Sequence, residues 1–172
     1  MRQEAKEVND VKRKAILLGT AAALVLLFFW LRGCFLSDEE RVRRIILSMA
    51  DGFNRSRAGQ IVDPLAEGYV EETSRHDRTD VRGYLGVLFL TQRDPKTKEF
   101  RYRVEVENLS VTMDAEKPGK AQVVVVASFL ALGARGYEPV WRVEVSASLD
   151  RTDDGWKVMR STHRGLSGKR PF

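Results

Sequence analysis

The sequence predicts an α+β domain preceded by one transmembrane helix. Before Asp94-Pro95 the apolar residues recur at helical spacing, and after it they alternate with polar residues, as in β-strands. Helical segments followed by consecutive strands with short connections are typical of α+β folds with an antiparallel meander. An uncharged run at residues 15–31 stands ahead of this pattern in the 172-residue chain.

The uncharged run predicts a membrane-spanning helix. Its 17 residues would cover roughly 25 Å at a rise of about 1.5 Å each, the short end of bilayer-spanning lengths. It has no polar stripe, which a helix on a soluble core would carry. We therefore divide the chain into a cytoplasmic tail (1–14), a transmembrane signal anchor (15–33), a folded domain (34–166) and a disordered tail (167–172).

The flanking charges predict the orientation of this anchor. Five basic residues precede the run, and lysine and arginine concentrate on the cytoplasmic side of membranes. The domain is therefore expected outside the cytoplasm, held by a single pass in the inner (cytoplasmic) membrane of a bacterium. Two alternatives stay open. One is a cleaved signal peptide, although the bulky 28–31 segment is unlike a cleavage site. The other is a lipoprotein signal modified at Cys34, which follows Gly33.

Composition excludes several classes of function. The net charge is +5, but from residue 35 onward basic residues exceed acidic ones by only two, which does not predict a nucleic-acid partner. A single cysteine excludes an internal disulfide. Two histidines and one cysteine form no metal-ligand spacing, and no glycine-rich phosphate loop is present. We predict neither a cofactor nor a metal.

Three helices and a short strand are expected before residue 94. Ser37 and Glu40 have capping-box spacing, apolar residues follow on one face as far as Phe53, and Gly59 suits a C-cap. Asp63-Pro64 predicts the start of a short second helix through Glu67. Residues 69–73 predict a strand. Thr79 or Asp80 is expected to cap a third helix whose apolar face runs to Phe89.

Four strands are expected after the Asp94-Pro95 turn, from residue 100 onward. Apolar and polar residues alternate from Phe100 onward. The alternation is interrupted at Asn108-Leu109, which predicts a bulge. Residues 122–132 are nearly continuous apolar and predict a central strand. Residues 141–150 again alternate between apolar and polar and predict a third strand. A tight turn at 152–155 leads into a last strand at 156–164. Trp141 and Trp156 are expected in the core.

This order of elements resembles the nuclear-transport-factor-2-like superfamily, which includes ketosteroid isomerases and SnoaL-like cyclases. The resemblance rests on the Leu65–Glu71 segment, the Thr79–Phe89 helix and the closing Asp154–Val158 segment. It implies that the antiparallel sheet is strongly curved into a cone around the three helices. It also implies a pocket at the wide end, near Tyr69, Tyr84, Tyr102 and Arg160.

The same resemblance gives one weak catalytic candidate. Glu72 falls near the proton-shuttling carboxylate of the ketosteroid isomerases, in which a tyrosine of the first helix helps to stabilise the enolate. The corresponding stretch here, Asp51–Asn54, has no hydroxyl group. His76 beside Asp77 and His163 near the chain's end are interpreted as surface residues. The sequence thus leans away from an enzyme, and we assign no catalytic residue.

We therefore expect a membrane-anchored, extracytoplasmic binding or assembly module for a small apolar ligand or a protein partner. Its architecture resembles the inner-membrane assembly factors of type IV secretion systems. A tethered isomerase- or cyclase-like enzyme and a non-catalytic small-ligand sensor are the alternatives. The mixed charges of residues 101–107 and 142–144 could make the exposed sheet face a homodimer interface, or they could pair across strands within one chain.

Overall fold

The computed structural model describes residues 36–172, of which residues 38–172 form one compact unit. The expected cytoplasmic tail, the signal anchor and the Cys34 modification site lie outside the described residues. Between residues 36 and 172, no helix is both long and apolar enough to cross a membrane.

Three helices precede the long strands, as expected, but their bounds differ from the prediction. They are α2 (Asp38–Asn54), α3 (Ala58–Val62) and α4 (Arg78–Thr91). The first helix ends at Asn54, because Ser56 adopts a left-handed φ of 54° that a helix cannot continue through. Gly59 therefore lies inside α3 and is not the C-cap of the first helix.

Two further boundary predictions are wrong. Asp63 follows the end of α3 and does not start a helix, and β1 (Leu65–Glu71) begins two residues later. Pairing with β6 overrides the local helix signal here, since Pro64 O accepts a hydrogen bond from Val158 N (2.9 Å). In α4 the N-cap is Asp77, whose carboxylate accepts from Thr79 N and Asp80 N. Asp80 completes this capping box at the third helical position.

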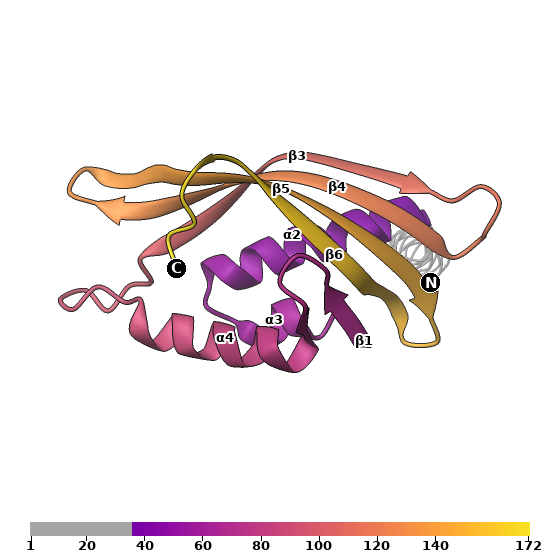
Figure 1. Cartoon of the computed structure of the whole chain (residues 1–172), viewed down its shortest axis with the longest axis horizontal. Helices are drawn as coiled ribbons and strands as arrows, with labels where there is room; N and C mark the ends of the chain where they lie inside the picture. The colour runs from indigo at the N-terminus through magenta and orange to yellow at the C-terminus, as the bar shows by residue number, and fades with distance from the viewer. Residues whose placement is uncertain (1–35) are drawn as a thin grey trace, which may run out of the picture. The chain divides into compact units, whose positions relative to one another are not determined.

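Six strands form one sheet in the order β2-β1-β6-β5-β4-β3 (Figure 1). The meander consists of β3 (Tyr102–Met113), β4 (Lys120–Gly133), β5 (Gly136–Thr152) and β6 (Gly155–Gly168), and each neighbour pair in it is antiparallel. The bulge predicted at residues 108–109 is confirmed, because the register shifts between Val106 and Asn108. The predicted central position of β4, between two long strands, is also confirmed.

One edge of the sheet departs from the all-antiparallel prediction. Strand β1 pairs in parallel with β6 and antiparallel with the two-residue β2 (His76–Asp77). No short turn joins β1 to β6, so nothing in the local sequence imposes an antiparallel direction. The direction follows from packing, since it buries the side chains of Leu65 and Tyr69 against the core.

The helices cover the concave face of the curved sheet (Figure 1). Trp156 is buried in the core, as predicted, whereas Trp141 is half-buried and stacks on Phe129 (ring centroids 5.1 Å apart). On the opposite face, charged side chains pair within the chain. Arg142 contacts Glu107 (2.7 Å) and Arg164 contacts Glu144 (2.8 Å).

The end of the chain differs from the disordered tail expected from residue 167. Strand β6 continues to Gly168, and the ring of Phe172 packs among aromatic side chains of the domain. In Figure 1 the C-terminal segment turns back and ends between the sheet and the helices. These contacts between aromatic rings favour the packed position of Phe172.

Candidate functional site

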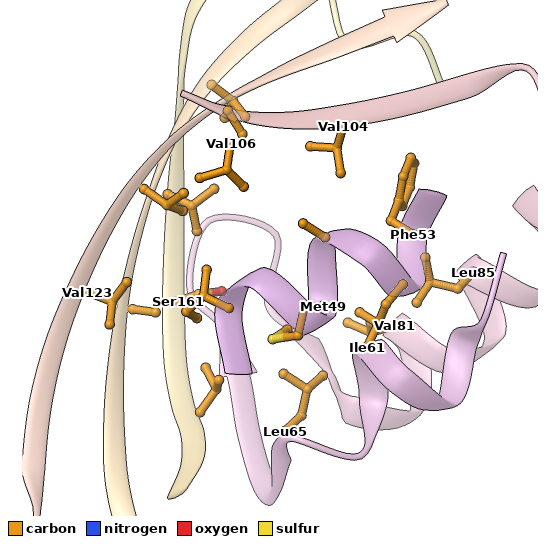
Figure 2. A pocket seen from close by; sticks show the side chains of 18 of the residues that line it. Met49, Phe53, Ile61, Leu65, Val81, Leu85, Val104, Val106, Val123 and Ser161 are labelled. Atoms are coloured by element: carbon orange, nitrogen blue, oxygen red, sulfur yellow. The ribbon is translucent and has the colours of Figure 1, made fainter. Parts of the chain in front are cut away.

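A cavity of about 300 Å³ lies between the helices and the inner face of the sheet. Figure 2 shows side chains from α2, α3, α4 and the strands converging on it. Only two of its lining residues, Tyr69 and Ser161, carry a side-chain oxygen or nitrogen atom. We call this space the inner cavity. Its lining includes Met49, Phe53, Ile61, Leu65, Val81, Leu85, Val104, Val106, Val123, Val125, Ala127, Val143, Val145 and Ala147.

The inner cavity exists because the strands present short side chains to it. Alternation along β4 and β5 places mainly valine and alanine on the inner face, including Ala127 and Ala147. Because these side chains are short, a space remains between this part of the sheet and the helices. With only two hydroxyl groups in its lining, the cavity offers few partners that could hold water.

Tyr69 and Ser161 form the polar pair of the inner cavity. Their hydroxyl oxygens are 2.7 Å apart and hydrogen-bonded, and Tyr69 is 6% exposed. Burial raises the pKa of Tyr69, the hydrogen bond with Ser161 partly offsets this, and the nearby charge of Glu71 raises it further. The phenol is therefore neutral at physiological pH and can donate a hydrogen bond to a ligand oxygen.

A second space, of about 240 Å³, adjoins the inner cavity, because the two share Val81, Leu85, Phe129, Val143, Val145 and Ser161 in their linings. We call it the vestibule. It is more polar than the inner cavity, and its other lining side chains are aromatic, basic, acidic or, in one case, a serine. These are Glu71, Ser74, His76, Tyr84, Trp141, His163, Arg170 and Phe172.

Glu71 and His163 form an ordered pair in the vestibule. The Glu71 carboxylate lies 3.1 Å from Nδ1 of His163, and their side chains are 12% and 26% exposed. Glu71 also accepts hydrogen bonds from Ser74 N (2.6 Å), Thr73 N (3.2 Å) and the Ser74 hydroxyl. Burial alone would raise the pKa of Glu71, but these hydrogen bonds outweigh it and lower the pKa from 4.5 to about 2.

This lowered pKa predicts a pH dependence of stability. Because Glu71 ionises more readily in the folded state, its contribution is fully present above about pH 4.5 and is lost as the pH falls toward 2. Glu71→Gln should therefore be less stable than wild type at pH 6, and the difference should shrink between pH 5 and pH 2. Urea unfolding across this range measures it. Glu67→Gln, an exposed position on the same strand, is the control, and a constant difference at all pH values would contradict the assignment.

Two of the four residues expected to line one pocket lie in the linings of two different spaces. Tyr69 lines the inner cavity and Tyr84 the vestibule. Tyr102 lines neither and donates a hydrogen bond from its hydroxyl to Pro171 O (3.2 Å). Arg160 points to the opposite face of the sheet, where it pairs with Glu72 (3.2 Å). Both partners of this pair are exposed, so Glu72 does not face the cavity.

A bulge in β6 explains which residues sequence reasoning missed. Leu149 pairs with Val158 and Ser148 pairs with Arg160, so Met159 is an extra residue that reverses the alternation. Arg160 therefore turns outward, while Ser161 and His163 turn inward. The interpretation of His163 as a sheet-surface residue is thus wrong. Trp156 and Val158 are buried, so uninterrupted alternation would have turned Arg160 inward and His163 outward. No local signal in the sequence marks the bulge.

Among residues 36–172, no group of three or more histidine, cysteine, aspartate or glutamate side chains is placed to bind a metal ion.

Sequence comparisons add no assignment, since no family model and no curated protein matches the chain. Structural comparison does find relatives of the fold. One is an NTF2-like (nuclear transport factor 2-like) protein with a cystatin-like fold from Novosphingobium aromaticivorans. It aligns over 89% of this chain and 92% of its own, with a TM-score of 0.60 and 15% identity.

Two further structures agree with this likeness. A proposed dehydratase of the NTF2-like family from Streptomyces avermitilis aligns over 76% of this chain and 97% of its own (TM-score 0.57, 14% identity). A domain of unknown function with a cystatin-like fold from Nostoc punctiforme aligns over 73% and 75% (TM-score 0.55, 18% identity). The chain thus has the nuclear-transport-factor-2-like fold that its element order predicts. Identities this low establish the fold alone, and proteins of one fold differ in function.

Proposed function

We propose that this domain is a binding module for a small, largely apolar molecule that carries one hydroxyl or carbonyl group. The observation that carries the proposal is the inner cavity, whose apolar lining contains a single polar pair, Tyr69 and Ser161. Ligand sites typically combine an apolar wall with a few placed polar groups. The wall supplies affinity in proportion to the apolar area that the ligand removes from water.

The polar pair gives the ligand an orientation. Tyr69 can turn its hydroxyl hydrogen from Ser161 to a ligand oxygen, while Ser161 keeps a hydrogen bond with Tyr69 or with the ligand. An apolar ligand without an oxygen leaves this pair as it is. A ligand with one oxygen gains a buried hydrogen bond, typically worth about 0.5 to 1.5 kcal/mol.

The direct test is binding of 2-naphthol and naphthalene to the full chain, measured by fluorescence titration. Both should bind, and 2-naphthol should bind about two- to tenfold more tightly because of the hydrogen bond. Tyr69→Phe should reduce this preference and leave naphthalene binding unchanged. If neither compound bound, the proposal would be wrong.

A tethered enzyme is the second candidate function, and the Glu71–His163 pair favours it. A carboxylate that holds Nδ1 of histidine leaves Nε2 to exchange protons with a substrate, the arrangement of a general base. Elimination of 5-nitrobenzisoxazole, which needs only proton removal from carbon, is a suitable assay. Turnover by wild type that fell by about 100-fold or more in His163→Ala would favour this candidate. Equal rates in the two proteins would reject it.

We further propose that residues 15–31 tether this module to the inner membrane with residues 36–172 outside the cytoplasm. In a Cys34→Ser background, a cysteine introduced at Ser167 should react with a membrane-impermeant thiol reagent in intact cells. A cysteine introduced at Gln3 should not react, because the basic flank predicts that it lies in the cytoplasm. The reverse pattern would overturn the orientation. Acyl mass on the native chain, starting at Cys34, would instead establish the lipoprotein alternative.

A further inference from the structure

The vestibule is closed on one side by residues 169–172, which we call the C-terminal strap. Two hydrogen bonds anchor it: Lys169 N donates to Val140 O (3.2 Å), and the Tyr102 hydroxyl donates to Pro171 O (3.2 Å). The guanidinium of Arg170 lies 5.5 Å above the Tyr84 ring. The strap is therefore held by a few local contacts and not by a strand ladder.

Phe172 is the part of the strap that reaches the binding space. Its ring centroid lies 6.1 Å from that of Phe53 and 5.6 Å from that of Phe129, both of which line the inner cavity. It also lies 6.3 Å from the centroid of Tyr84 in the vestibule. Phe172 thus stands where the two spaces meet and contacts the walls of both.

The surroundings of Phe172 indicate what could replace it. Phe129 and Trp141 stack on one another in the vestibule wall, and Tyr84 also lines this space. Contacts between aromatic rings are individually modest. A flat aromatic ligand that extends from the inner cavity can make the same contacts with Phe129 that the Phe172 ring makes, so the ligand and the ring compete for the same place.

We propose that Phe172 is the specificity-determining residue of this site. The strap opens to admit the ligand, and its ring limits how far a flat aromatic molecule extends from the inner cavity into the vestibule. This inference rests on the proposed function, namely that the inner cavity binds a ligand. It adds the ligand class, a fused-ring aromatic, and the residue that sets the upper limit of its size.

The test compares two aromatic alcohols of different length, 2-naphthol and the four-ring 1-hydroxypyrene. The full chain is used in a Trp30→Phe background. Energy transfer to the probe then comes only from Trp141 and Trp156, so it reports binding to the domain. Phe172→Ala should raise the association and dissociation rates of 2-naphthol by about tenfold, because the ring no longer blocks the path. It should also shift the affinity ratio toward 1-hydroxypyrene by about tenfold or more.

Two further variants complete the experiment. Leu166→Ala removes an exposed apolar side chain of β6 that lines neither space, and should change neither rates nor ratio. Tyr102→Phe keeps every ring and removes one strap hydrogen bond, so it should raise the rates and leave the ratio unchanged. If Phe172→Ala bound 2-naphthol with the rates and ratio of Leu166→Ala, the strap would have no such role. If neither wild type nor Phe172→Ala bound 2-naphthol, the proposed function itself would be wrong.

Discussion

Replacing Trp156 by alanine should lower the free energy of unfolding by about 3 to 5 kcal/mol. The side chain is 5% exposed and packs in the cluster that contains Val42, Leu65 and Leu149. Its indole Nε1 also donates a hydrogen bond to Asp38 at the start of α2 (3.2 Å). The substitution therefore leaves a cavity in the core and removes a contact between the last strand and the first described helix.

The size of this effect makes it easy to test. A typical domain has a free energy of unfolding of about 5 to 15 kcal/mol, so the variant should lose much of its stability. Urea unfolding followed by far-ultraviolet circular dichroism measures the loss. Leu47→Ala, which removes a side chain that is 45% exposed on α2, should change the midpoint little. An unchanged midpoint for Trp156→Ala would mean that the packing around β6 is wrong.

Replacing Ala147 by phenylalanine should abolish ligand binding while the domain stays folded. Ala147 is 8% exposed and lines the inner cavity, and on β5 it lies opposite Ser161 of β6. A phenyl group at this position occupies the space beside the Tyr69–Ser161 pair. Because it fills an existing apolar cavity, the thermal midpoint should stay the same or rise.

The expected loss of 2-naphthol affinity is about 100-fold or more, because the ligand and the new ring cannot share the space. Ser146→Phe is the matched control, since its side chain alternates to the opposite face of the same strand and should leave binding intact. The measurement is the same fluorescence titration used for wild type. Unchanged affinity in Ala147→Phe would mean that 2-naphthol binds elsewhere.

The α+β class, the four-strand meander and the bulge near Asn108 could all be predicted from the amino-acid pattern. These features depend on the period of apolar residues and on turn residues, which act over a few neighbouring positions. Of the residues expected to line a pocket, Tyr69 lines the inner cavity and Tyr84 lines the vestibule, and a role of either in ligand binding stays a prediction. The membrane tether remains a prediction from residues 1–34, which lie outside the described structure.

Which carboxylate and which histidine face the binding space depends on tertiary packing. One extra residue, Met159, reverses the alternation of β6, so that Ser161 and His163 turn inward and Arg160 turns outward. The parallel pairing of β1 with β6 then brings Glu71 to His163 across 92 positions of sequence. Phe172 joins the aromatic rings in the same way, through contacts with residues as distant as Phe53. Local periodicity carries no information on such pairings, because they are selected by packing between elements that are far apart in the chain.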